Sequence, residues 1–263
     1  MIFDPAIWVG AILMGLSLGL LGSGGSILTV PLLVYIAHEP EKMAIAESLM
    51  IVGLVALTGS ISQFMKRLVD IKLVMVFGIP SMFAAYLGAY LSQFVGAQVQ
   101  MLIFSFVMLG ASVFMLKPLK APENSESTQN EKTNSHLSSS QYLVLVVAGI
   151  CVGTLAGLVG VGGGFLIVPA LLLIAKTTMR KAIATSLFII AMQSFAGFAK
   201  YSYLLNTQEF TFNLPLMFLV TACAIAGVLV GGKIVNKLPQ ARLKQFFGVA
   251  LIPLSLFILF SNV

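Results

Sequence analysis

Two short glycine-rich segments have the residue types and spacing to bind an anion. One reads Gly-Ser-Gly-Gly-Ser and the other Gly-Val-Gly-Gly-Gly, and each interrupts a long apolar run that continues to a proline. Glycine permits a positive φ and lets a ligand approach the main chain, while a helix that follows offers free N–H groups and the positive end of its dipole. The alternative is that these glycines only allow close helix packing. We predict substrate contacts at Gly22, Ser23, Gly24, Gly25, Ser26, Gly160, Val161, Gly162, Gly163 and Gly164.

The two segments belong to an internal repeat. Residues 19–59 align without a gap with residues 157–197, and 18 of these 41 positions are identical. A further stretch, 88–105, aligns with 231–248 once the register shifts by five residues. A glycine-interrupted apolar segment in each half of a chain is the best sequence indication of a transporter's binding site.

The composition is that of a membrane protein. Of 263 residues, 59% are hydrophobic and 9% are charged, and the mean hydropathy is +1.02. Soluble domains are about one quarter charged. The net charge of +6 comes from basic residues between apolar segments, where they set membrane orientation, so we expect no nucleic-acid partner. The two cysteines lie in apolar stretches without metal-ligand spacing.

Eight apolar runs are long enough to form membrane helices. The first and the fifth have 32 and 35 residues, more than the roughly 20 that cross the hydrocarbon core, and each contains one glycine cluster near its middle. We expect each of these two runs to break into two half-helices, with both hairpin tips meeting near the membrane midplane. The runs are approximately 6–37, 44–65, 73–95, 99–116, 141–175, 182–203, 211–236 and 244–262.

Charge placement favours a fold-back arrangement. If all eight runs crossed once, the 15 Lys and Arg residues would divide 7 to 8 between the two sides, but if the first and fifth fold back they divide 13 to 2. The positive-inside rule prefers the second division. The predicted fold class is an all-α polytopic membrane protein with two inverted repeats, each a Gly/Pro-broken re-entrant hairpin plus three transmembrane helices. Both termini are predicted outside the cytoplasm, in the plasma or inner membrane.

The halves are separated by a polar stretch rich in Ser, Asn and Glu, which cannot bury a core. We therefore predict a first transmembrane repeat over 1–117, a flexible cytoplasmic linker over 118–140 and a second repeat over 141–263.

The paired motifs GLLGSGGSILTVPLL and GLVGVGGGFLIVPALL, each followed by a helix that opens Ala-Ile-Ala-x-Ser-Leu, resemble the TauE/SafE family of sulfite exporters. The pattern from Gly227 to Gly248 is similar to that family's terminal helices. The resemblance covers nearly the whole chain outside the linker. It implies a permease, usually an exporter, for sulfur-containing anions such as sulfite or organosulfonates, which moves them by alternating access.

One residue departs from the family pattern. The second copy has Thr185 before Ser186, whereas the first has Glu47 before Ser48. An acid inside an apolar run is a functional candidate, and Glu47 could transfer a coupling proton. Alternatively, it lies in the first helical turn, where an acid interacts favourably with the helix dipole.

Other polar side chains within the apolar runs are candidates for substrate binding. Ser48, Thr185 and Ser186 can donate hydrogen bonds toward a cavity, and Gln193 is the most deeply placed amide of its segment. Each could equally bond a neighbouring helix or its own backbone. Lys200 and Lys233, near helix ends, are expected to extend toward the membrane interface.

Enzymatic and metal functions find little support. The segment from Gly15 to Gly19 fits the G-x-S-x-G pattern, but the repeat replaces Ser17 by Leu155 and neither histidine lies in an apolar run. We expect no catalysis, no cofactor and no bound metal. A passive anion channel and, with less support, a cation permease remain alternatives to the transporter. The oligomeric state is not predicted.

Overall fold

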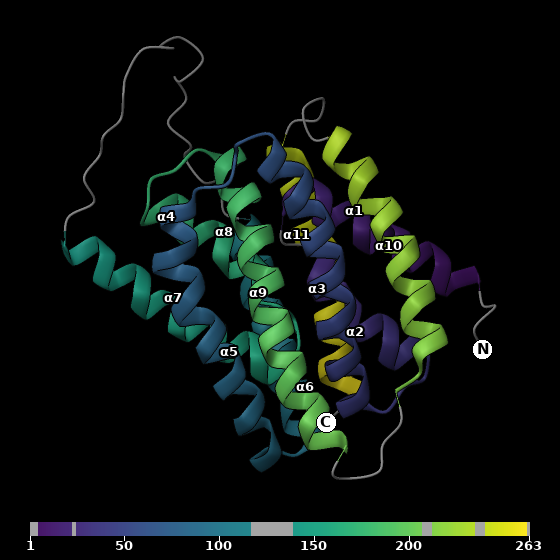
Figure 1. Cartoon of the computed structure of the whole chain (residues 1–263). Helices are drawn as coiled ribbons and strands as arrows, with labels where there is room; N and C mark the ends of the chain where they lie inside the picture. Colours follow the sequence, from purple (N-terminus) through teal and green to yellow (C-terminus); the bar gives the residue numbers. More distant parts are fainter. Residues whose placement is uncertain (1–4, 23–24, 117–138, 207–211, 235–239, 262–263) are drawn as a thin grey trace.

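The described part of the chain consists of helices joined by short loops. The computed structural model describes residues 5–22, 25–116, 139–206, 212–234 and 240–261 (Figure 1). Its α-helices are α1 (Pro5–Leu21), α2 (Gly25–Pro31), α3 (Glu41–Met65), α4 (Ile71–Leu73), α5 (Ile79–Leu91), α6 (Ala97–Leu116), α7 (Ser139–Val159), α8 (Gly164–Leu173), α9 (Met179–Asn206), α10 (Leu214–Ile234) and α11 (Gln240–Ser261). Two π-helical turns, η1 (Leu32–Ile36) and η2 (Val74–Gly78), and a 3-10 turn, η3 (Ser92–Phe94), extend α2 and flank α5.

Both glycine-rich segments break a helix and turn the chain back on itself. In the first hairpin, Gly25 at the start of α2 lies so close to Met14 and Leu18 of α1 that a side chain there would overlap them. In the second hairpin, Gly163 immediately before α8 faces Ala156 of α7. Each break is therefore a hairpin rather than a kink in a continuous helix.

The two arms of each hairpin are unequal in length. The first arms, α1 and α7, have 17 and 21 residues, which is about 26 and 32 Å of helix. The second arms, the continuous helix Gly25–Ile36 and the 10-residue α8, extend about 18 and 15 Å. Each run therefore breaks into two helices, as expected, but α7 is long enough to span a membrane, whereas α1 and the two returning arms are shorter.

Helices α3 and α9, which are equivalent in the repeat, form the centre of the bundle, and each half contributes a hairpin to the other half. In Figure 1, α1 lies with α10 on one side of this central pair, and α7 lies with α5 on the other. Gly15 of α1 contacts Ala224 and Gly19 contacts Val228, so α1 and α10 run in the same direction. In the contacts of α7 with α5 the residue numbers also rise together, so these two helices run parallel as well.

The central pair runs antiparallel. Leu49 of α3 contacts Gly197, and Gly59 contacts Leu187, so residue numbers fall in α9 as they rise in α3. If the first and fifth apolar runs each crossed the membrane once, these equivalent helices would be parallel. An antiparallel central pair is what folded-back runs would produce, and the inverted repeat and its orientation in a membrane stay predictions.

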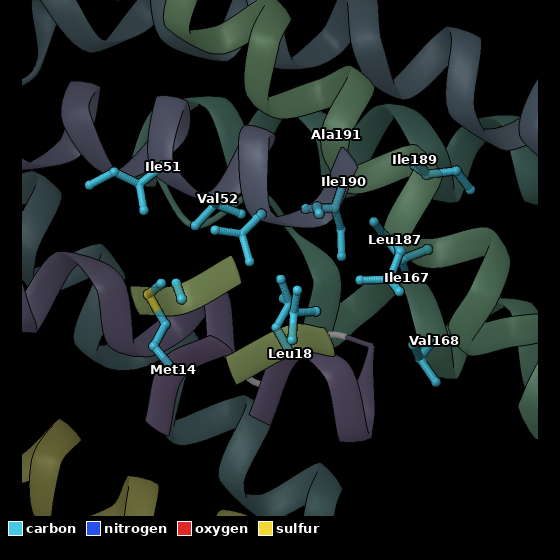
Figure 2. Close-up of a cluster of buried hydrophobic side chains, with 14 of the residues drawn as sticks. Met14, Leu18, Ile51, Val52, Ile167, Val168, Leu187, Ile189, Ile190 and Ala191 are labelled. Atoms are coloured by element: carbon cyan, nitrogen blue, oxygen red, sulfur yellow. The ribbon is translucent and has the colours of Figure 1, made fainter. Parts of the chain in front are cut away.

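The interior between the hairpins contains a cluster of buried apolar side chains. Figure 2 shows Leu18 of α1, Val52 of α3 and Ile190 of α9 pointing toward one another. Each of these three side chains is at most 1% exposed. Burial of apolar area stabilises a fold by roughly 25 cal/mol per Å². The burial of this cluster therefore stabilises the packing of both hairpins against the central pair.

Five helices are long and apolar enough to cross a membrane, judged by length and composition among the described residues. They are Glu41–Met65, Ile71–Phe94, Ser140–Val159, Met179–Leu205 and Leu214–Ile234. Large apolar side chains such as Phe83, Phe218 and Phe260 are two-thirds or more exposed on the bundle's outside, as expected for a surface that faces lipid. The chain is a polytopic α-helical membrane protein.

A candidate anion site at the helix breaks

The second break is stabilised in a conformation that favours glycine. Gly160, Gly162 and Gly163 have φ values of +79°, +67° and +63°, in the left-handed region that costs other residues roughly 1–2 kcal/mol. Gly163 caps α8 without any side-chain hydrogen bond, and its carbonyl accepts the N–H groups of Leu166 and Ile167 over 3.1 and 3.3 Å, so the N-terminus of α8 lies at this break. Gly164 begins that helix, and Val161 is buried in the apolar core.

Two buried polar side chains of α9 face this break. The Oε1 atom of Gln193 lies 3.0 Å, and the Oγ atom of Ser194 2.9 Å, from the places where side chains on Gly163 and Gly162 would begin. Both residues are 0% exposed. Neither polar atom of Gln193 nor the Oγ of Ser194 has a hydrogen-bond partner among the described residues. A buried polar group without a hydrogen-bond partner costs about 1–3 kcal/mol. A ligand bound at this polar cluster would supply the missing partner and remove that cost.

The first break is described only in part. Gly22 has φ +69°, and Gly25 and Ser26 are buried at the start of α2, whereas Ser23 and Gly24 lie outside the described residues. In the repeat, Val55 and Ala56 of α3 stand where Gln193 and Ser194 stand in α9. Of the two breaks, the second is therefore the one that Gln193 and Ser194 supply with buried polar atoms without partners, as far as the chain is described.

Each break is hydrogen-bonded to one serine of the opposite half. The Ser48 hydroxyl donates to the Gly160 carbonyl over 2.6 Å, and the Ser186 hydroxyl donates to the Gly22 carbonyl over 3.1 Å. Each hydroxyl also lies within hydrogen-bond distance of a carbonyl in its own helix. In the structure both serines satisfy carbonyls that the broken helices leave free, and their predicted role as substrate donors stays a prediction.

The two breaks lie near opposite ends of the central pair. Gly160 contacts Ile45, close to the start of α3, and Gly22 contacts Ile183, close to the start of α9. Because Leu49 faces Gly197, the serines bound to the two breaks are separated by about 12 residues, or roughly 18 Å along the helices.

The turn of the first hairpin, at Ser23 and Gly24, lies outside the described residues, so the meeting of the two hairpin tips near the membrane midplane stays a prediction. From Gly160 the chain then returns inward, since Gly162 contacts Val52 and Ile190 at the centre.

Glu47 and Thr185 take equivalent positions and make equivalent hydrogen bonds. Glu47 Oε1 accepts the backbone N–H of Asn213 over 2.9 Å, and Thr185 Oγ1 accepts that of Asp70 over 3.0 Å. Each N–H belongs to the residue that precedes a third-span segment, which begins with α10 or α4. In the first pair the acidic residue, Glu47, is the acceptor. In the second pair the acidic residue, Asp70, supplies the backbone donor. Glu47 is 0% exposed and its second oxygen, Oε2, has no described partner.

A basic cavity opens beside the first break. Its volume is about 210 Å³, many times the roughly 10–15 Å³ that one water needs. It lies between the last turns of α3 and α10, near Leu187, the neighbour of Ser186 in α9. Lys66, Lys233, Ser62 and Gln63 supply its polar lining. Two lysines at one cavity attract an anion. We call this end of the bundle the cavity end and the opposite one the far end.

Sequence reasoning missed Ser194 and the pairing of Lys66 with Lys233. The signal for Ser194 was present, because the repeat replaces an alanine by serine beside the glutamine already singled out. The two lysines are 167 residues apart in the sequence, and only the packing of α3 against α10 brings them to one cavity. No group of three or more potential metal-binding side chains occurs among the described residues.

Broken helices, buried polar groups at a break and a lipid-facing exterior define a membrane transport protein. The sequence profile of the family Sulfite exporter TauE/SafE matches residues 7–258, and the chain belongs to this family.

Its relatives have similar descriptions. A probable membrane transporter protein of Xylella fastidiosa (strain Temecula1) is 28% identical over 95% of this chain and 92% of its own. The probable membrane transporter proteins YunE and YdhB of Bacillus subtilis are 30% and 26% identical, over 71% and 89% of this chain and 75% and 91% of their own. No solved structure matches the chain.

Proposed function

We propose that this protein is a secondary transporter that exports small sulfur-containing anions such as sulfite or organosulfonates. The observation that supports this most is the pair of buried polar side chains without partners at the second break, namely Gln193 and Ser194, beside the N-terminus of α8. Both are neutral, so they stabilise a negative charge through hydrogen bonds, together with the helix dipole. The family's name supplies the substrate class.

The path of the anion begins at the cavity. Lys66 and Lys233 raise the local anion concentration at the cavity end. From there the anion passes the first break and reaches Gly162, Gly163 and Gln193 near the centre. The apolar cluster around Val52 and Ile190 blocks this path in the present conformation. Transport requires the hairpins to move against the central pair, which is alternating access.

Proton coupling is the second part of the proposal. Glu47 is next to Ser48, which binds the carbonyl of the second break, and its Oε2 atom has no described partner. A carboxyl group at this place can gain a proton as the anion arrives and lose it as the anion leaves. The hydrogen bond of Oε1 to the Asn213 backbone also gives Glu47 a structural role, so the two must be separated by experiment.

The decisive experiment is a proteoliposome assay with purified protein. Radiolabelled sulfite, thiosulfate, a small sulfonate, sulfate and a divalent cation are tested in parallel, and uptake is measured with and without unlabelled substrate inside. We expect saturable sulfite or sulfonate uptake that internal substrate accelerates, because a carrier exchanges bound anions. Uptake without such acceleration would indicate a channel, and uptake of the cation alone would contradict the proposal.

A matched pair of variants connects this activity to the break. Gly162→Ala adds a methyl group at a position with φ +67° and 2.9 Å from Ser194 Oγ, so we expect uptake to be lost. Gly110→Ala is the control, because nothing lies within 4 Å of a side chain at that position. Both proteins should insert and purify as the wild type does. Retained uptake by Gly162→Ala would remove the second break from the site.

A further inference from the structure

The far end of the bundle contains a counterpart of the basic cavity. The repeat pairs each residue of α3 with the residue 138 positions later in α9, and each residue of α10 with the residue 143 positions earlier in α5. By this correspondence, Ser62 in the cavity lining is equivalent to Lys200. Leu229 and Lys233 in that lining are equivalent to Tyr86 and Tyr90. The place that is hollow at the cavity end is therefore occupied by a lysine and two tyrosines at the far end.

These residues form an aromatic cage around the Lys200 ammonium. Nζ lies 4.8 Å from the ring centre of Tyr90, 5.6 Å from that of Tyr86 and 5.0 Å from that of Tyr203. Lys200 is only 9% exposed, and no carboxylate pairs with it in the described part of the chain. Its ammonium lies between α5 and α9 against tyrosines that are 40–66% exposed, and its extension toward the membrane interface stays a prediction.

A caged ammonium is a weakly satisfied charge. Ring faces attract a cation through their quadrupoles, but they offer no negative charge, and a buried charge without a counter-ion is costly. A small anion that entered this region would therefore be a better partner for Lys200 than the rings are. The same charge would then serve the far end as Lys66 and Lys233 serve the cavity end.

The neighbouring contacts connect the cage to the second break. Tyr201, next to Lys200, donates its hydroxyl to the Leu158 carbonyl over 3.1 Å and accepts from the Gln100 amide over 2.9 Å. Leu158 lies two residues before Gly160, where the second break begins. The cage therefore stands beside the second break as the cavity stands beside the first.

We propose that Lys200 is the anion-binding lysine of a second vestibule at the far end, and that Tyr86, Tyr90 and Tyr203 hold its ammonium while that vestibule is closed. Movement of α5 away from α9 opens the cage and presents Lys200 to the anion. This inference rests on the proposed function for its ligand, a small sulfur-containing anion. The closed far end and the open cavity end describe one conformation of the transport cycle.

The first test needs no transported substrate. In the full chain with Cys151→Ala and Cys223→Ala, a Leu204→Cys thiol is placed one helical turn beyond Lys200. Its reaction rates with an anionic and a cationic methanethiosulfonate reagent are compared. We expect the anionic-to-cationic rate ratio to fall about tenfold with Lys200→Gln, which corresponds to the loss of one charge-assisted contact, and to be kept with Lys200→Arg. An unchanged ratio in Lys200→Gln would overturn the proposal.

A second variant leaves Lys200 unchanged, so its result does not depend on whether Lys200→Gln folds correctly. Tyr90→Leu, with Lys200 intact, loosens the cage and should raise the anionic rate at the Leu204→Cys thiol at least severalfold. An unchanged or reduced rate would mean that the tyrosines do not close the vestibule and would overturn that part of the proposal.

The sidedness of transport gives the final comparison. With radiolabelled sulfite in oriented proteoliposomes, Lys200→Gln should raise the KM about tenfold from the far end and leave it within about twofold from the cavity end. Lys66→Gln, the matched control, should do the reverse. Equal effects from both faces would overturn the assignment. If the wild type carries no sulfite, the substrate proposal fails, and the thiol ratios still decide the role of Lys200.

Discussion

At the scale of single residues, a substitution of Gln193 distinguishes a contribution to folding stability from a contribution to transport. Neither polar end of its buried amide has a described partner, so the apolar Gln193→Leu variant should be about 1–3 kcal/mol more stable and yet defective in anion uptake. Thermal unfolding in detergent and proteoliposome uptake would measure both. Gln193→Leu with normal uptake would exclude this amide from the substrate site.

Gln100 provides the matched control. Its amide donates to the Leu158 carbonyl over 2.6 Å and to the Tyr201 hydroxyl over 2.9 Å. Gln100→Leu should therefore lower stability by about 1–3 kcal/mol, because it removes a donor from the Tyr201 hydroxyl and leaves the Leu158 carbonyl with the Tyr201 hydroxyl as its remaining donor. A gain in stability there would show that these hydrogen bonds do not stabilise the fold.

Glu47 has a conservative substitution that isolates its proton. Glu47→Gln keeps the oxygen that accepts the Asn213 backbone N–H and removes only the ability to change charge. If Glu47 transfers a coupling proton, the variant's uptake rate should vary little between acidic and neutral pH, whereas the wild type's should vary strongly. Identical pH profiles would leave Glu47 with its structural hydrogen bond alone.

Residue types predicted part of the candidate site, and tertiary contacts decided the rest. The depth of Gln193 in its apolar run was visible in the sequence, and so was the glycine content of the second break. The group to which the Ser48 hydroxyl donates was not visible in the sequence, because that acceptor is the carbonyl of Gly160, 112 residues away. A hydroxyl that can donate to a ligand can donate equally well to a free carbonyl, and sequence spacing does not distinguish the two.

At the scale of elements, the parallel helix pairs depend on glycine. Gly157 of α7 lies so close to Ala85 of α5 that a side chain there would overlap its backbone. Gly157→Ala should cost about 1–3 kcal/mol of stability through overpacking, seen as a lower unfolding temperature in detergent. Gly110→Ala, in open space on α6, should cost nothing, since alanine favours the helix. Equal stability of both variants would contradict the close packing.

Element lengths explain why the hairpins were predicted only in outline. The glycine clusters and the excess length of two apolar runs indicated where each chain turns back, and the structure has breaks at both places. Nothing in an apolar sequence fixes where along a span its break lies, because the membrane depth of α1 and α7 is set by their packing against α10 and α5.

At the scale of the whole molecule, orientation is the principal prediction. The division of 13 basic residues to 2 places the cavity end, with Lys66 and Lys233, in the cytoplasm, and both termini on the other side. Reporter fusions at residues 1 and 263 that are active only outside the cytoplasm should both be active, and one within the predicted linker should be silent. A carboxyl terminus inside the cell would reverse the proposed sidedness of the cavity.

The exchange of hairpins between the halves also bears on how the chain is made. The principal partner of α1 is α10, which begins only at Leu214. During synthesis α1 is therefore complete long before its partner, and we expect its glycine surface to stay uncovered until α10 has been inserted.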